Sequence, residues 1–163
     1  MDAVRLIGVC RHALAQSRAE WDTVAEAWQA QALAQAIGGH LALTGPPELR
    51  AEARGLAESG GRGCGALDPV ELPIGAVRAA QLTEVADVRA ALTGLGILLG
   101  EVGIALVGVG CATDVDGLYW QCIEAVDAAD ESGDRVRGML RRLTVREQER
   151  PSGPVHDSAA GPS

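Results

Sequence analysis

The chain has 163 residues, which is enough for one domain with one hydrophobic core. A hydrophobic content of 47% excludes a disordered polypeptide, and an aromatic content of only 2% makes the core aliphatic and rich in alanine. The scarcity of aromatic and threonine side chains disfavours a β-sandwich or barrel. The net charge of -8 disfavours nonspecific binding to nucleic acid or to an anionic membrane surface.

The composition also indicates the source and the compartment. All 14 basic residues are arginine, and lysine, asparagine and phenylalanine, whose codons are AT-rich, are absent. This bias is typical of a high-GC genome, most simply a bacterial one. The residues after Met1 show neither the basic start nor the apolar run of a signal peptide, and the 4 cysteines form no Cys-x-x-Cys pair. We therefore expect a bacterial, cytoplasmic protein with reduced thiols.

A helical period occupies the first segment, from Asp2 to Ile37. Apolar residues recur at every seventh position from Ile7 to Trp28, and charged side chains take the opposite face. The pair Gly38-Gly39 predicts the end of this helix. A short helix from Pro47 to Glu58 follows, because proline is favoured in a first helical turn, and the glycines from Gly60 to Gly65 predict a loop after it.

The strongest periodicity runs from Ala76 to Cys111. Apolar residues fill both alternating heptad positions of this segment: Val85, Leu92, Leu99 and Leu106 in one, and Val88, Leu95, Val102 and Val109 in the other. Asp114 and Asp116 then predict a turn and a helix N-cap. A final amphipathic helix is expected from Asp114 to Glu149.

These segments predict an all-α fold. We expect an up-and-down bundle of three long helices and one short helix, forming a single domain over residues 1–150. Residues 151–163 are rich in proline, glycine, serine and alanine, which predicts a disordered C-terminal tail. The blocks EAWQAQAL at residues 26–33 and GLYWQCIE at residues 117–124 resemble those of a family of uncharacterised helical proteins from actinobacteria. The resemblance extends to about Leu143 and implies no activity and no functional residue.

Acidic residues near the start of the last predicted helix invite two metal-binding interpretations. The turn at residues 114–117 lacks the third oxygen ligand and the distal glutamate that a calcium loop needs. The acidic stripe from Glu124 to Asp134 is better explained as a solvated face, because no histidine follows a glutamate by three residues. Cys64 has no neighbouring base. We therefore predict no catalytic residue, no metal site and no cofactor.

Glycines inside the third long helix need an explanation, since each costs about 1 kcal/mol relative to alanine. They are Gly94, Gly96, Gly100, Gly103, Gly108 and Gly110. Close helix packing, a membrane span, a ligand cavity or a break in the helix could each account for them. Glu101 is the only charge in the stretch and argues against lipid. It either reaches water or an arginine at the bundle edge, or lines a pocket with Gly100, Tyr119 and Trp120 opposite the small residues of the last helix.

The few aromatic residues are informative because of their placement. Trp21 and Trp28 share one face of the first helix, and we expect both in the core. Tyr119 and Trp120 are adjacent and therefore about 100° apart on a helix, so at least one should be partly exposed.

The favoured function is that of a non-enzymatic interaction or regulatory protein that acts through helix-to-helix contacts as a homo-oligomer. The last helix is acidic in its first part and arginine-rich in its second, so two antiparallel copies would be complementary across a two-fold axis. The apolar residues expected in that dimer interface are Trp120, Ile123 and Leu140. The basic ones are Arg137, Arg141 and Arg142. In a monomer, these arginines would instead serve an acidic partner protein.

The alternative function is that of a small-molecule-binding bundle with an apolar pocket beside the stretch Gly94–Gly110 and Glu101. An enzyme ranks third, because no acid–base pair and no activated nucleophile can be named from the sequence.

Overall fold

The computed structural model describes residues 1–69 and 72–150, and over these residues the fold is all-α with no strand, as predicted. The elements are α1 (Ala3–Gln16), α2 (Glu20–Thr44), η1 (Pro47–Leu49), α3 (Arg50–Ala66), η3 (Arg78–Gln81), α4 (Val88–Ala112) and α5 (Asp116–Glu149). The described part therefore contains five α-helices, where the sequence analysis predicted three long helices and one short one. The tail predicted to be disordered, residues 151–163, lies outside the described residues.

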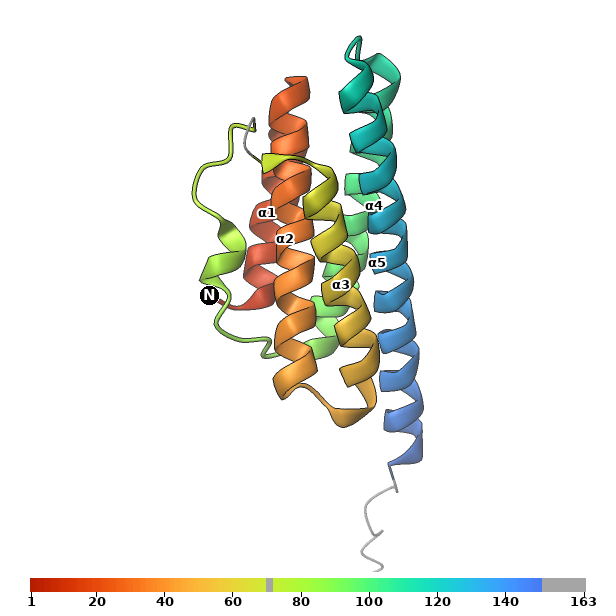
Figure 1. Cartoon of the computed structure of the whole chain (residues 1–163). Helices are drawn as coiled ribbons and strands as arrows, with labels where there is room; N and C mark the ends of the chain where they lie inside the picture. The colour runs from red at the N-terminus through yellow and green to blue at the C-terminus, as the bar shows by residue number, and fades with distance from the viewer. Residues whose placement is uncertain (70–71, 151–163) are drawn as a thin grey trace, which may run out of the picture.

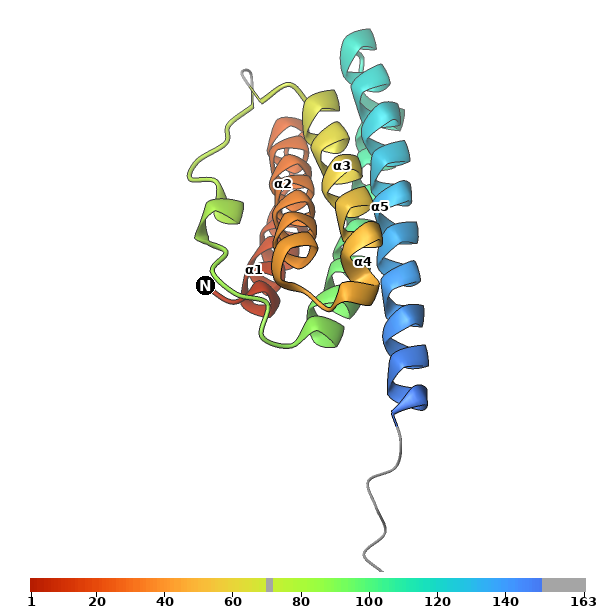
Figure 2. The ribbon, with the colours of Figure 1, turned by 60° about the horizontal axis from the view of Figure 1, so that its bottom comes forward.

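The helices pack around one aliphatic core. In the bundle, α2 lies against α3, α3 against α5 and α5 against α4, while α1 contacts α2 and α4 (Figure 1). Consecutive helices alternate in direction except for α3 and α4, which run the same way because residues 72–87 return along the outside of the bundle (Figure 1). The predicted up-and-down order is therefore interrupted by this crossover. The C-terminal end of α5 extends past the other helices (Figure 2).

The predicted helix from Asp2 to Ile37 is wrong in one respect, because it is broken into α1 and α2. Ser17 is extended at the end of α1, where its amide donates to the carbonyl of Leu14 at 3.2 Å and its hydroxyl to that of Ala13 at 3.0 Å. The heptad pattern continues across the break because both helices turn their apolar faces into the same core, with Leu14 and Val24 buried. A periodicity that serves two helices cannot reveal the turn between them.

Two glycine signals for helix ends are also wrong. Helix α2 continues through Gly38 to Thr44, and α3 continues through Gly60 to Ala66. A Cβ atom on Gly38 would lie 2.6 Å from the backbone nitrogen of Ala57. One on Gly60 would lie 2.7 Å from the backbone nitrogen of Gln35. These glycines therefore permit close contact between α2 and α3 and do not end their helices.

Helix α4 begins at Val88, well after the predicted start at Ala76. Asp87 caps it by accepting a hydrogen bond from the Ala90 amide at 3.0 Å. The preceding residues run as the outer connection, in which the amide of Ala86 donates to the Asp2 carboxylate at 3.1 Å. Helix α5 begins at Asp116 with Val115 as its N-cap and no side-chain cap, so the predicted capping by aspartate is wrong.

Candidate interaction surface

Helix α4 presents an apolar outer face. It packs against α1, α2 and α5 and leaves one stripe exposed. The exposed residues of this stripe are Ala90, Thr93, Ile97, Gly100, Ile104, Val107, Gly108, Cys111 and Ala112, called here the α4 face. None of them is charged, and the exposed fractions of Ile97, Ile104 and Val107 are 47%, 77% and 48%. Their spacing of three and four residues makes them one continuous surface.

The two charged residues of α4 are held at the edges of this face. Arg89 Nη2 lies 2.9 Å from the Glu147 carboxylate on α5. Glu101 accepts hydrogen bonds from Arg11 of α1, with Nη2 at 2.6 Å and Nε at 3.1 Å. The hydrogen bond to Glu101 raises the pKa of the Arg11 guanidinium, which stays charged. The prediction of an edge acid paired with an arginine is confirmed for Glu101.

The α4 glycines fall into two groups, and the helix does not break at either. A Cβ on Gly94 would lie 3.3 Å from Ile7, one on Gly96 3.4 Å from Val136 and one on Gly110 3.6 Å from Cys122, so these three lie at helix contacts. A Cβ on Gly100, Gly103 or Gly108 would meet nothing within 4 Å. Packing within the protomer therefore does not require glycine at these three positions.

The small residues of α5 do not form the predicted wall opposite Glu101. Ser132 faces α3, where its hydroxyl lies 2.7 Å from that of Ser59 in a buried hydrogen bond. The carbonyl of Ala125 accepts a hydrogen bond at 3.2 Å from the buried amide of Gln31 on α2. These residues belong to the contact of α2, α3 and α5.

A groove runs between the α4 face and α1. It has a volume of about 470 Å³ and is lined by Arg11, His12, Leu14, Ala15, Glu101, Ile104 and Ala105. A second groove of about 450 Å³ shares Leu14 and Ala105 and continues towards Ala112. Both are open surface features. Of the residues predicted to bind a ligand, Glu101 lines the first groove, whereas Gly100, Tyr119 and Trp120 line neither.

Exposed aromatic side chains flank the other side of α4. The Tyr119 ring lies 3.8 Å from where a Cβ of Gly110 would stand, and it meets Trp120 edge to face with centroids 5.1 Å apart. Both are exposed, Tyr119 at 40% and Trp120 at 63%, which confirms that the pair is not fully buried. The prediction that Trp21 is in the core is wrong, because its position in the first turn of α2 leaves it 39% exposed.

The residues predicted for an α5 interface divide between two sides of the helix. The helical repeat of about 100° per residue places Ile123, Arg137 and Arg141 within about 40° of Tyr119, on the side next to the α4 face. Trp120 and Arg142 lie farther round, away from α4. Leu140 is half-buried and packs against the core, so it offers little surface.

The arginines themselves differ in their partners. Arg137 forms an ion pair with Asp134, whereas Arg141 and Arg142 are exposed and make no ion pair with any described residue. A groove of about 430 Å³ near the C-terminal end of α5 is lined by Glu48, Glu52, Gly138, Arg141, Arg142, Val145, Arg146 and Glu149. Its charges are mixed, so it favours neither an anion nor a cation.

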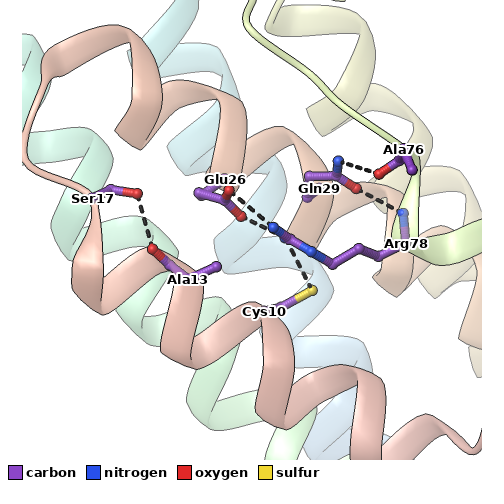
Figure 3. Close-up of polar contacts among 7 residues, drawn as sticks. All are labelled: Cys10, Ala13, Ser17, Glu26, Gln29, Ala76 and Arg78. Carbon is purple, nitrogen blue, oxygen red and sulfur yellow. Dashed lines mark hydrogen bonds and ion pairs between the residues drawn. The ribbon is translucent and has the colours of Figure 1, made fainter.

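A polar cluster that sequence reasoning missed fastens the outer connection to α1 and α2 (Figure 3). Arg78 forms a two-point ion pair with Glu26, with Nη2 3.0 Å from Oε1, and its backbone amide donates to Gln29 at 3.0 Å. The Gln29 amide donates in turn to the carbonyl of Ala76 at 3.0 Å. Arg78 also contacts the Cys10 sulfur at 3.9 Å. The cluster is structural, and no spacing signal marks a pair 52 residues apart.

The three cysteines that the fold buries fully or in part are not activated nucleophiles. Burial raises the pKa of the Cys64 thiol to about 12 and that of Cys122 to about 11. Burial also raises the pKa of Cys10, despite the nearby Arg78 guanidinium. These thiols are therefore protonated at neutral pH and are poor nucleophiles. Within residues 1–69 and 72–150, no group of three or more His, Cys, Asp or Glu side chains could hold a metal ion.

By length and composition, α4 is the one helix of the described residues that could cross a membrane, with a mean hydropathy of 2.1 over a stretch that is 39% buried. The core helix of a soluble protein passes the same test.

The fold and its surface define an all-helical bundle whose most distinctive feature is one uncharged, apolar helix face. Residues 1–142 match the family of unknown function DUF6099, and the chain belongs to that family. No curated protein and no solved structure matches the chain.

Proposed function

We propose that the protein is a non-enzymatic interaction protein that acts through helix-to-helix contacts as a homo-oligomer, and that the α4 face is its contact surface. The observation that carries this proposal is the exposure of an uncharged apolar stripe along the whole of α4, with Ile104 at 77%. A bacterial, cytoplasmic setting is part of this proposal, and the absence of lysine, asparagine and phenylalanine, which is typical of a high-GC genome, supports the bacterial part.

The size of the surface is compatible with a specific interface. Helix α4 has 25 residues, which gives a length of about 37 Å. With α1 and α5 on either side at helix spacings of about 9 Å, the layer is about 25 Å wide. At a helix diameter of about 10 Å, the α4 face itself supplies about 400 Å² of this layer. An interface with the roughly 800 Å² per partner that stable protein interfaces bury would therefore also use the flanking sides of α1 and α5.

The hydrophobic effect favours burial of such a surface. Contiguous apolar patches of this kind on a protein surface mark interaction sites. The two charged residues of α4 itself are already neutralised, because Glu101 is paired with Arg11 and Arg89 with Glu147. Burial of the α4 face would therefore remove apolar area from water without stranding an unpaired charge.

A small-molecule-binding function is the second candidate, and one observation favours it. The groove of about 470 Å³ has apolar walls from Leu14, Ala15 and Ile104 and a polar end at the Arg11–Glu101 pair. A measurement of the mass in solution separates the two functions. A ligand-binding monomer would bind its ligand without changing mass, whereas an interaction protein would associate in the absence of any ligand.

The proposal is tested with two charge substitutions at exposed apolar positions. Ile104→Glu places a charge at the centre of the α4 face. Leu43→Glu is the matched control, because Leu43 is 81% exposed at the far end of α2. Light scattering should show that Ile104→Glu is monomeric, while Leu43→Glu keeps the mass of the wild type. Circular dichroism should show unchanged helix content in both. Loss of assembly in both variants, or in neither, would contradict the role of the α4 face.

A further inference from the structure

We infer that the occupant of the α4 face is a second copy of this chain, packed antiparallel about a two-fold axis near Val102, with Ile104 of each copy seated on Gly100 of the other. This inference rests on the proposed function, because it requires the α4 face to be the contact surface. It adds the identity of the partner, the direction of its helix and the register.

The shape of the α4 face supports this register. Ile104 is its most prominent side chain, at 77% exposed, and Gly100, one turn away, has open space where a Cβ would stand. An antiparallel two-fold axis midway between them places each isoleucine over the partner's glycine. The same axis brings Ile97 of each copy opposite Val107 of the other, so apolar side chains face each other on both sides of the axis. A protrusion and a hollow on one surface are what a self-complementary interface requires.

The exposed glycines themselves point to an external contact. A glycine inside a helix is destabilising relative to alanine. Nothing in the protomer approaches the Cβ positions of Gly100 and Gly108 within 4 Å. Contacts within the protomer do not explain why position 100 is glycine. A partner side chain that enters the space above Gly100 would explain it. A parallel arrangement would place Gly100 against Gly100, which leaves a gap, and Ile104 against Ile104, where the two side chains collide.

The charges of α5 also favour the antiparallel direction. Helix α5 runs antiparallel to α4, with Gly96 beside Val136 and Gly110 beside Cys122, so Val102 lies level with Asp130. The two-fold axis then carries the arginine-rich part of α5 towards the acidic part of the partner's α5. Arg137 comes opposite Ile123 of the partner and Arg141 opposite Tyr119, so neither arginine faces its own copy, and Asp130 is the one charged residue of this side that lies at the axis and meets its own copy. A parallel dimer would set Arg137 and Arg141 against themselves, and like charges repel.

The opposite flank is compatible with the same axis. Glu101 is next to Val102, so the Arg11–Glu101 pairs of the two copies meet near the axis. Each carboxylate is then within reach of two guanidinium groups in an alternating arrangement with no net charge. Such an arrangement satisfies the charges at the edge of the interface and fixes the orientation of the two copies.

The test uses two variants of the full chain that each carry one introduced cysteine in a Cys111→Ser background, which leaves the buried Cys10 and Cys122 and the half-buried Cys64 in place. Ile97→Cys and Val107→Cys lie opposite each other across the axis. Each lies about 15 Å from its own copy in the partner, along the helix. A disulfide requires Cα atoms within about 7 Å. Each variant is first confirmed to keep the mass of the wild type by light scattering, and it is then oxidised alone or as an equimolar mixture.

We expect the mixture to form the cross-linked heterodimer at least about ten times faster than either variant forms its own homodimer. Self-cross-linking of each variant alone would show a parallel dimer, which overturns the inference and leaves the proposed contact surface standing. A dimer with neither cross-link overturns the inferred register, and if Ile104→Glu leaves that dimer intact, another surface is used and the proposed function is overturned as well. A monomer overturns both as well, and binding of that monomer to phosphatidylcholine vesicles would assign the α4 face to a membrane.

A larger side chain at Gly100 independently tests the contact between Ile104 of one copy and Gly100 of the other. Gly100→Leu fills the space above the glycine and should weaken dimerisation by at least about tenfold without changing the folded protomer. Gly65→Leu is the matched control, since a Cβ there also meets nothing within 4 Å but lies at the end of α3. Equal dimerisation of both variants would show that Gly100 does not receive the partner's side chain.

Discussion

Gly38 lies inside α2 and Gly60 inside α3, and neither ends its helix. Substitution of Gly38 by alanine tests whether close contact between α2 and α3 explains these glycines. The new Cβ would lie 2.6 Å from the Ala57 nitrogen, 2.8 Å from the Ala53 oxygen and 3.1 Å from the Ala57 Cα. All three are backbone atoms of α3, so no side-chain rotation can relieve the collision. The two helices must separate, and overpacking of this kind costs about 1–3 kcal/mol or more.

Helix propensity acts in the opposite direction. Alanine is favoured over glycine inside a helix by about 1 kcal/mol. Because the collision is with backbone atoms, we take the upper end of the overpacking range, and the net destabilisation of Gly38→Ala is expected at about 2 kcal/mol. The adjacent Gly39 is the matched control, because a Cβ there meets nothing within 4 Å in the same helix. Gly39→Ala should therefore be more stable than the wild type by up to about 1 kcal/mol.

Thermal unfolding followed by circular dichroism measures both variants. For a chain of this length, about 1 kcal/mol corresponds to a shift of about 2–4 °C in melting temperature. Gly38→Ala should melt several degrees below the wild type and Gly39→Ala slightly above it. Equal or higher stability of Gly38→Ala would refute the close-packing explanation.

Three further outcomes are expected. In the monomeric Ile104→Glu variant at pH 8, the exposed Cys111 should react with a thiol reagent at once and the other cysteines only on unfolding; rapid reaction of a second thiol would contradict the described burial. Because the fold raises the pKa of Cys64 from 9.0 to about 12, the stability that depends on its protonated thiol is complete below about pH 9 and lost as the pH rises towards 12. Cys64→Ser should therefore flatten the alkaline limb of a stability–pH curve, and an unchanged limb would exclude this thiol as the cause. Arg78→Ala strands the carboxylate of Glu26, of which only 20% is exposed, and should cost about 1–3 kcal/mol. Hydrogen exchange should then accelerate in residues 76–86, and exchange at the wild-type rate would show that the pair does not hold the connection.

The sequence predicted those parts of the fold that depend on a simple helical period. The heptads of α4 bury Leu92, Leu95, Leu99 and Leu106, and α5 runs nearly as long as predicted. The break between α1 and α2 escaped prediction because no glycine or proline marks residues 17–19 and because both helices share one core.

Gly38 and Gly60 led to the opposite error, because helix ends were predicted where the helices continue. A glycine ends a helix by adopting a left-handed backbone, and no glycine of the described residues has a positive φ. Gly38 and Gly60 instead allow one backbone to approach another, and the approaching helix is distant in the sequence. Only the assembled bundle distinguishes these two roles.

The candidate surface was partly visible in the sequence. The apolar stretch around Glu101 stood out, and its pairing with an arginine was among the predictions. The sequence could not show that Ile97, Ile104 and Val107 form a second apolar face, because the first face already accounts for a buried helix. Exposure depends on which side of α4 the neighbouring helices leave open, and this is a property of the fold alone.

The central claim is that the α4 face joins two copies of the chain, and sedimentation of the wild-type protein tests it most directly. The chain has a mass of 16.8 kDa. Between about 1 and 100 μM, an interface of standard size should produce a species of twice that mass, with the dimer fraction rising with concentration. A single species of 16.8 kDa across the whole range would contradict the account.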